Sequence, residues 1–294
     1  MASQNTSNKK KKIVGTGLTG LVGSRIVELL SNEYEFIPLG IDIRDRALVQ
    51  TKIAEAHPDY VLHLAAKTDV DGCEKEKHLG SKSEAWEINV QGTQNIIDAC
   101  TQSKSKLIFI STDFVFSGDS PHSEADRPNP INYYGETKLE AEKRVLTLEN
   151  NALVVRISFP FRAYYERKED IVRMFISALS QGKTVRAVKD QIITPTFIDD
   201  IAYAIRSCID LNTHGILHVC GNTSLSPYDL AMMIKNEFSL SGNVESVEFN
   251  DFYKGRADRP LKSVLSNGTI AALGIPMHSI EEALEELKKQ KTHI

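Results

Sequence analysis

Short apolar runs alternate with longer segments of helical periodicity through the first half of the chain. The apolar runs have the length of buried strands, and they lie at residues 13–14, 35–39, 60–64, 106–110 and 151–157. Between them, apolar residues recur with helical spacing at residues 24–30, 45–56, 84–100 and 134–148. Strands that alternate with helices predict parallel pairing through helical crossovers. We therefore expect an α/β fold with a Rossmann-type, doubly wound parallel sheet.

This alternation loosens after residue 157. Helical spacing returns at residues 169–180, 197–209, 227–237 and 279–289, and strands are predicted within 182–196 and at 216–220. Residues 67–83 and 119–132 are polar and predict loops, the first with at most one helical turn. We expect a disordered tail at 1–12, a dinucleotide-binding domain at 13–157, and a smaller C-terminal substrate-binding lobe at 158–294 that interleaves with it.

A glycine-rich turn follows the first predicted strand. Gly17, Gly20 and Gly23 form the pattern G-x-x-G-x-x-G, which leads directly into the helix predicted at 24–30. In a dinucleotide fold these glycines permit a tight turn, close approach of a pyrophosphate, and close packing of helix on strand. The N–H groups of the helix start bind phosphate as well. A flexible loop could carry the same glycines, but the flanking strand and helix favour a cofactor site.

The second predicted strand bears on which nicotinamide cofactor is bound. NAD-selective folds usually carry an acidic residue at the tip of this strand for the ribose 2′-hydroxyl. Here the strand ends in Leu39-Gly40, and Asp42 follows three residues after Leu39, with Arg44 and Arg46 close behind. Strict NAD selectivity is therefore not indicated, and the expected cofactor is NADPH or NADH.

Tyr134 and Lys138 are four residues apart and share one face of a predicted helix. A free tyrosine loses its proton near pH ~10, and a neighbouring ammonium group lowers that pKa by stabilising the phenolate. The pair suits proton transfer at neutral pH, although Tyr and Lys are also common on helix surfaces. Thr112 adds a hydroxyl at the end of the preceding strand. Asn89 is a candidate to bridge a water molecule to Lys138, or a solvated or kink-forming residue.

Composition narrows the class of protein. The 294 residues are 41% hydrophobic and 25% charged, with a formal net charge of −4, so neither nucleic-acid nor membrane-surface binding is indicated. No apolar run approaches the roughly 20 residues that span a bilayer, and the lysine-rich start lacks the apolar segment of a secretory signal. The four cysteines have neither C-x-x-C nor zinc spacing. We therefore expect reduced thiols, a cytoplasmic protein and no metal site.

Together these motifs resemble the extended short-chain dehydrogenase/reductase superfamily and, more narrowly, the dTDP-4-dehydrorhamnose reductase family. The resemblance covers nearly the whole chain after Lys12. The matching residues are Thr16-Gly17-x-x-Gly20-x-x-Gly23, His57-Pro58-Asp59-Tyr60-Val61, Ala65-Ala66-Lys67-Thr68-Asp69-Val70-Asp71, Ser111-Thr112-Asp113-Phe114-Val115-Phe116, Tyr134-Gly135-Glu136-Thr137-Lys138-Leu139, Asp190-Gln191, Pro195-Thr196, Arg259-Pro260 and Ser263. The resemblance implies an NAD(P)H-dependent reductase of a 4-keto nucleotide sugar, above all one that converts dTDP-4-dehydrorhamnose to dTDP-L-rhamnose.

The resemblance also implies a role for each site residue. The catalytic set is Thr112, Tyr134 and Lys138. Besides Tyr134 and Lys138, the cofactor contacts are Gly17, Gly20, Leu21 and Val22 at the pyrophosphate, Asp42 and Ile43 at the adenine, and Ala65, Ala66 and Thr68 beside the nicotinamide ribose. The sugar nucleotide faces Val70, Asp71, Phe159 and Arg259. From the residues alone, Asp71 is more simply a solvated loop carboxylate, and Arg259 is as simply a core or surface arginine.

Several alternatives stay open. Related dehydratases carry Thr-Asp-Glu after this strand, and Phe114 at the third position cannot move a proton, so dehydration is disfavoured. Nucleotide-sugar epimerases share the Tyr/Lys chemistry and are less firmly excluded, as is a reductase of another 4-keto sugar. A relative of the family is the non-catalytic regulatory subunit of methionine adenosyltransferase, against which the intact Thr112, Tyr134 and Lys138 argue. Family members can dimerise around a metal ion, which leaves a homodimer open.

Overall fold

Six parallel strands form the central sheet of the computed structural model, which describes residues 10–119 and 121–292. In their order across the sheet they are β2 (Glu35–Pro38), β1 (Lys12–Thr16), β3 (Tyr60–His63), β4 (Lys106–Thr112), β5 (Ala152–Ile157) and β10 (Gly215–Val219). Every residue of β5 is buried, as expected for a strand that is covered on both faces and needs no polar alternation.

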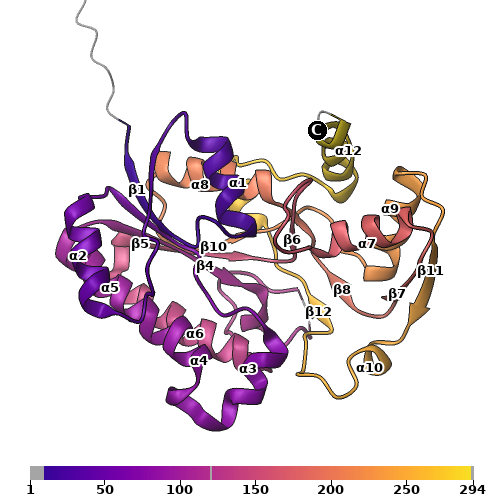
Figure 1. The fold of residues 1–294 in the computed structure, drawn as a ribbon, viewed down its shortest axis with the longest axis horizontal. Helices are drawn as coiled ribbons and strands as arrows, with labels where there is room; N and C mark the ends of the chain where they lie inside the picture. The colour runs from indigo at the N-terminus through magenta and orange to yellow at the C-terminus, as the bar shows by residue number, and fades with distance from the viewer. Residues whose placement is uncertain (1–9, 120, 293–294) are drawn as a thin grey trace, which may run out of the picture.

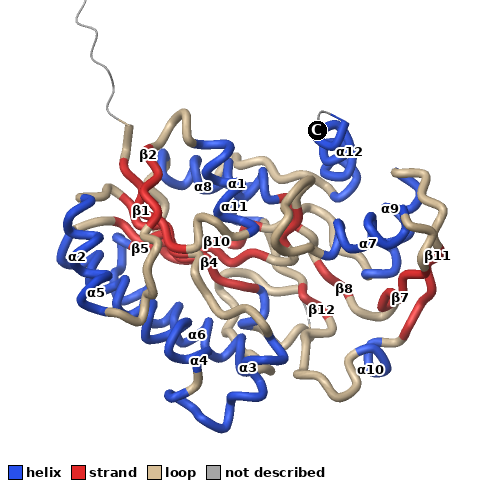
Figure 2. Tube along the Cα trace, in the orientation of Figure 1, coloured by secondary structure: helices blue, strands red, loops and turns tan. Residues whose placement is uncertain are grey.

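Helices cover both faces of this sheet (Figures 1 and 2). One layer contains α1 (Leu21–Leu30), α8 (Ile198–Asp210) and α11 (Gly268–Ala272), and the other contains α2 (Arg46–Ala56), α5 (Thr93–Ser103) and α6 (Tyr133–Val145). Alternate residues of β5 serve the two layers, because Leu153 and Val155 pack with the first while Ala152 and Val154 pack with the second. The predicted doubly wound, Rossmann-type fold is confirmed.

The second half of the chain contributes to the main sheet and also builds a smaller lobe. Helix α8 and strand β10 belong to the sheet region, where β10 pairs with β5. The lobe has its own core among α7 (Ile171–Ser180), β7 (Thr184–Val188), α9 (Pro227–Glu237), β11 (Asn243–Val247) and α12 (Ile280–Thr292). The remaining short elements are β6 (Pro160–Phe161) paired with β9 (Thr196–Phe197), β8 (Ile192–Ile193) paired with β12 (Lys262–Ser263), and α10 (Phe249–Phe252).

The prediction of a loop at residues 67–83 is wrong. This segment holds α3 (Val70–Glu76) and a 3-10 helix at Lys77–Lys82, and Asp69 caps α3 by accepting a hydrogen bond from the Gly72 N–H at 3.0 Å. Cys73 is the one buried residue of α3, so the helix lacks the repeated apolar positions that would have predicted it. The helix predicted next is confirmed as α4 (Glu84–Trp86), a π-helix at Glu87–Gly92, and α5.

Two predicted boundaries also change. Of the tail expected at 1–12, residues 1–9 lie outside the described residues, while Lys12 is the first residue of β1 and pairs with Glu35. The helix predicted at 134–148 ends at Val145, where a 3-10 helix at Leu146–Asn151 leads into β5. Within the described part of the chain, no helix is both long and apolar enough to cross a membrane.

Candidate active site

The glycine turn between β1 and α1 is built for close approach of a ligand. Gly17 has a φ of 68°, the left-handed conformation that favours glycine, and its carbonyl accepts the Gly20 N–H at 2.9 Å. Helix α1 begins after Gly20 with no side-chain cap, so side chains leave the N–H groups of its first turn free for a phosphate. A Cβ at Gly23 would lie 2.4 Å from the Gly17 carbonyl oxygen. The turn therefore fits a dinucleotide pyrophosphate.

Replacing Gly23 by alanine tests this packing. The new methyl group would overlap the Gly17 carbonyl, and we expect the free energy of unfolding to fall by ~1–3 kcal/mol, with weaker NADPH binding. Urea denaturation and a fluorescence titration measure the two effects. Gly268→Ala in α11 is the matched control, because its Cβ would meet the Ser266 hydroxyl at an ordinary 3.6 Å. Equal stability of the two variants would contradict the close packing at Gly23.

A cavity of about 460 Å³ opens beside the glycine turn, at the carboxyl ends of the sheet strands. Many of the residues predicted for the site line it. They are Gly17, Gly20, Leu21, Val22, Ala65, Ala66, Thr68, Thr112, Tyr134, Lys138 and Phe159. Ligands of open α/β sheets bind at this edge, since the strand ends and the helix starts meet there. The structure thus brings the glycine turn and the Tyr/Lys pair to one cavity.

Helix α6 holds Tyr134 and Lys138 against the end of β4. Asn132 caps the helix by accepting the Gly135 N–H at 2.8 Å. The Lys138 Nζ donates to the Ile110 carbonyl at 2.8 Å and lies 3.9 Å from the centre of the Phe109 ring. The Tyr134 phenol has the Thr112 hydroxyl as its hydrogen-bond partner. All three predicted catalytic side chains therefore converge on the cavity.

Burial controls the titration of both groups on α6. It raises the pKa of the Tyr134 phenol, and the hydrogen bond with Thr112 acts in the opposite direction. Burial also lowers the pKa of Lys138 from its usual 10.5 to about 7, against the attraction of Glu142. The sequence predicts a phenol made more acidic by its lysine neighbour. In this structure the direction is reversed, because removing the phenol from water disfavours its charged form.

Lys138 gives a pH-dependence prediction. Between its folded pKa of about 7 and its ordinary value of 10.5, the unfolded chain binds the extra proton, so stability rises with pH in that window. We expect wild type to gain stability relative to Lys138→Met from roughly pH 7 to pH 10, by at most ~1.4 kcal/mol per pH unit. Urea denaturation at a series of pH values measures this gain. Parallel curves for the two proteins would contradict a buried, weakly basic lysine.

Asp113 is a functional candidate that sequence reasoning missed. It begins a 3-10 helix at Asp113–Val115, and its buried carboxylate lines the cavity. It accepts hydrogen bonds from Thr112 at 3.0 Å and from Ser158 at 2.9 Å. Burial raises the pKa of Asp113 to about 6 in spite of these bonds. In the sequence only its place in the Ser-Thr-Asp run points to it, because its partner Ser158 comes from a distant segment.

Phe159 is a strained residue in the cavity lining. Its φ is 40°, in the left-handed region that a bulky residue rarely adopts. Its ring meets Phe114 edge-on at 6.5 Å, and Phe114 meets Tyr134 in the same way at 6.0 Å. The Phe159 carbonyl accepts the Thr196 N–H at 3.2 Å, which helps to fix the strained residue. Strain of this kind concentrates at functional sites.

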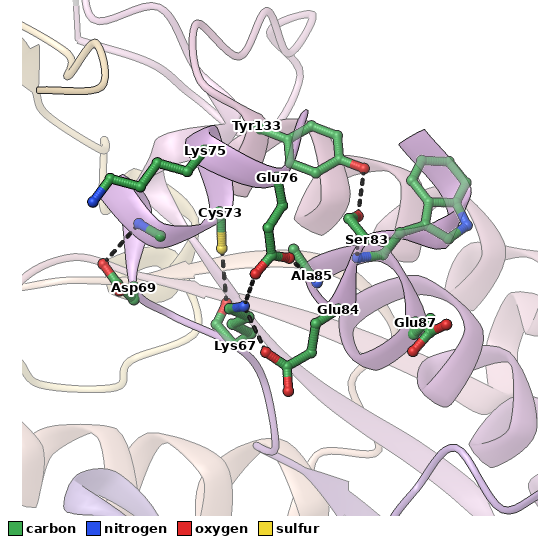
Figure 3. A network of polar contacts seen from close by, with 12 residues as sticks. Lys67, Asp69, Cys73, Lys75, Glu76, Ser83, Glu84, Ala85, Glu87 and Tyr133 are labelled. Carbon is green, nitrogen blue, oxygen red and sulfur yellow. Dashed lines mark hydrogen bonds and ion pairs between the residues drawn. The ribbon is translucent and has the colours of Figure 1, made fainter. Parts of the chain in front are cut away.

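A polar network supports the segment that follows β3. Figure 3 shows the Lys67 ammonium group between Glu76, its ion-pair partner, and Glu84, whose Oε2 lies 2.6 Å away. Asn89 accepts the Lys67 N–H at 2.8 Å, and its Nδ2 donates to the Lys67 carbonyl at 3.1 Å and to the Thr137 hydroxyl at 2.9 Å. Asn89 thus bonds directly to Thr137, the neighbour of Lys138, and a water bridge from Asn89 to Lys138 stays a prediction. The network ties Ala65–Thr68 to α6.

Several predicted ligand contacts lie outside the cavity lining. Asp71 and Arg259 form an ion pair with each other at 2.8 Å, and Val70 packs against a small cluster that includes Tyr134. Asp42 is paired with Arg44 at 2.6 Å, while Ile43 is buried in the core under α2 and α5. The structure therefore places these residues outside the cavity lining, although Val70 packs close to Tyr134. Among the described residues no three metal-ligating side chains come together.

Comparison with known proteins shows which family has this fold and sequence. The family model described as the RmlD substrate binding domain matches residues 11–292. The chain belongs to the RmlD family. An RmlD-family structure, the dTDP-4-dehydrorhamnose reductase of Bacillus anthracis in complex with NADP, is 32% identical with a TM-score of 0.87, over 96% of this chain and 99% of that one. The predicted membership of the dTDP-4-dehydrorhamnose reductase family is confirmed.

The names of two further relatives indicate different functions. Spore coat polysaccharide biosynthesis protein SpsK of Bacillus subtilis is 30% identical over 96% of this chain and 98% of that protein. The beta subunit of methionine adenosyltransferase 2 of Bos taurus is 28% identical over 90% of this chain and 83% of that protein. Membership of the RmlD family therefore leaves the substrate to be argued from the site.

Proposed function

We propose that this RmlD-family chain is an NAD(P)H-dependent reductase of a 4-keto nucleotide sugar, with dTDP-4-dehydrorhamnose as its substrate and dTDP-L-rhamnose as its product. The observation that carries the proposal is the meeting of Thr112, Tyr134 and Lys138 with the glycine turn in one cavity. Such a cavity provides a proton donor beside a dinucleotide site, which is what the reduction of a ketone requires.

The chain would hold the cofactor mainly through backbone groups. Gly17, Gly20, Leu21 and Val22 would receive the pyrophosphate at the start of α1, and Ala65, Ala66 and Thr68 would border the nicotinamide ribose. Asp42 and Ile43 remain our proposal for the adenosine end, which would follow the end of β2. A bound reduced nicotinamide supplies the hydride for the ketone carbon.

Tyr134 would provide the proton. Its raised pKa keeps the phenol protonated at neutral pH, so it can donate to the alkoxide oxygen that develops on the substrate. The Thr112 hydroxyl would share a hydrogen bond with the same oxygen. Lys138 lies one helical turn along α6, where its ammonium form would favour the phenolate left after proton transfer.

The sugar nucleotide would occupy the side of the cavity toward the C-terminal lobe. Phe159 offers an aromatic face for the sugar, and Val70 and Asp71 follow the cofactor-facing segment. The Arg259 guanidinium is held by Asp71 and lies 5.0 Å from the centre of the Tyr253 ring. A guanidinium pairs a diphosphate at two points, so a nucleotide diphosphate would compete with Asp71 for it.

A turnover assay tests the proposal. Purified protein with NADPH and dTDP-4-dehydrorhamnose should oxidise the cofactor, followed by its absorbance, and dTDP-rhamnose should appear by chromatography. The same assay with UDP-linked and other dTDP-linked 4-keto sugars ranks the substrates. If NADPH binds but none of these sugars is reduced, the reductase assignment fails.

A second candidate is a regulatory subunit of a methionine adenosyltransferase. It is favoured by the 28% identity to the beta subunit of that enzyme. This function requires a stable complex with a catalytic subunit, and it gives the Tyr/Lys pair no catalytic role. Size-exclusion chromatography with a methionine adenosyltransferase, beside the turnover assay, separates the two candidates: a complex without keto-sugar turnover supports the regulator.

A further inference from the structure

Residues 162–170 form a strap between β6 and α7, and two of its residues line the cavity. Its two ends are buried: Arg162 donates to Ser24 of α1 at 2.9 Å and to Glu28 at 2.7 Å, and Asp170 caps α7 by accepting the Arg173 N–H at 2.9 Å. Arg162 and Asp170 also join through the Arg162 N–H, at 3.4 Å. The strap is therefore anchored at both ends.

The middle of the strap is fixed by one buried arginine. The Arg173 guanidinium donates to the backbone carbonyls of Tyr165 and Lys168 and to the Asp170 carboxylate, the last at 2.7 Å. The Arg162 and Arg173 guanidinium groups lie 5.7 and 5.8 Å from the centre of the Tyr165 ring. These contacts set the direction of the two strap side chains that line the cavity, Tyr165 and Lys168.

These two side chains contact two different segments beside the cavity. The Tyr165 hydroxyl donates to the Thr19 carbonyl, inside the glycine turn, at 2.7 Å. The Lys168 Nζ donates to the Thr68 hydroxyl, after β3, at 3.4 Å. Thr68 and the glycine turn both line the cavity, and both belong to the segments that we propose to border the cofactor. The strap therefore places an ammonium group beside Thr68, in the same cavity as the glycine turn.

The charges of the cavity make that ammonium group significant. Among the described residues, Lys168 makes no ion pair with a carboxylate, and the first turn of α1 holds no charged cap. The lining cations are Lys168 and the buried Lys138, which is committed to the Ile110 carbonyl. Of these two lining cations, Lys168 is the exposed one, and it shares the cavity with the glycine turn where an anionic pyrophosphate would bind. Ammonium–phosphate pairs are strong hydrogen bonds.

We infer that Lys168 pairs with the pyrophosphate of the bound dinucleotide and that Tyr165 holds the strap at the glycine turn for this contact. The inference rests on the proposed function for the identity of the cofactor. The diphosphate of the sugar nucleotide is the other anion available to the site. The bonds to Thr19 and Thr68 favour the dinucleotide, because both residues belong to segments that we propose to border it. Arg259, our candidate for the sugar-nucleotide diphosphate, is instead paired with Asp71 of α3.

Direct binding measurements test the role of Lys168. We expect Lys168→Ala to raise the Kd for NADPH about tenfold and to weaken its salt dependence, and Lys168→Arg to restore most of the affinity. Arg167→Ala is the matched control, because Arg167 is an exposed neighbour on the strap that does not line the cavity. Its Kd should stay within about twofold of wild type. Calorimetric titration of the full chain, with no keto sugar present, gives these values.

A parallel titration with dTDP distinguishes the two phosphate sources. Binding of dTDP should be equal in wild type and Lys168→Ala. A loss confined to dTDP, or unchanged NADPH binding in Lys168→Ala, would overturn the inference. Thermal denaturation checks that the exposed substitution leaves the fold intact. If wild type binds no NADPH, the proposed function fails together with this inference; if it binds NADPH and Lys168→Ala binds it equally, this inference alone fails.

Discussion

Replacing Tyr134 by phenylalanine is expected to lower kcat for the proposed reduction by about a thousandfold, the usual range for loss of a general acid. The phenol is buried in the cavity, its pKa is raised, and Thr112 is its hydrogen-bond partner, so it is a protonated donor aimed at the site. Phenylalanine keeps the ring and its edge contact with Phe114 at 6.0 Å. Cofactor affinity should therefore change little, and steady-state kinetics beside an NADPH titration measure both quantities.

The preceding residue supplies the matched control for this variant. Tyr133 is also buried on α6, but its hydroxyl donates to the Gly80 carbonyl at 2.7 Å and meets Ser83 at 2.8 Å, away from the cavity. Tyr133→Phe should lose some stability and keep its turnover within a few-fold. Comparable turnover in Tyr134→Phe and Tyr133→Phe would rule out the proton role of Tyr134.

Replacing Glu142 by glutamine is expected to lower the free energy of unfolding by ~3–5 kcal/mol, because it leaves a buried guanidinium without its counter-ion. Glu142 of α6 holds Arg156 of β5 through two hydrogen bonds, at 3.0 and 2.7 Å, and both side chains are 1% exposed. Arg156 also lies 5.0 Å from the centre of the Phe116 ring and 3.3 Å from His218. Urea denaturation measures the loss.

Two further variants test whether the loss of stability comes from the unpaired buried charge. Glu55→Gln on α2 removes one partner of an exposed pair with Lys52 at 3.1 Å and should change stability by less than ~0.5 kcal/mol. The double replacement Glu142→Leu with Arg156→Met removes both buried charges and should recover much of the stability. A single-variant loss near that of the exposed pair would show that water reaches the buried guanidinium.

The elements that the sequence predicts well are those whose signal is local. Strands β1, β3, β4 and β5 read as apolar runs because both faces of a parallel sheet are covered. The turn from Gly17 to Gly23 and the spacing of Tyr134 and Lys138 need only a few consecutive residues, and these positions do line one cavity. Helix α3 was not readable, since Cys73 is its buried residue and its cap, Asp69, looks like any loop residue.

By itself, the amino-acid sequence determined the Rossmann-type order of strands and helices, the glycine turn and the family, because periodicity and short motifs are properties of neighbouring residues. Only the tertiary structure decided the environment of each group. Burial reversed the expected direction of the Tyr134 pKa, the distant Ser158 supplied a hydrogen bond to Asp113, and the strap brought Lys168 to Thr68 in the cavity. Desolvation and long-range hydrogen bonds depend on how distant segments pack, which no local pattern encodes.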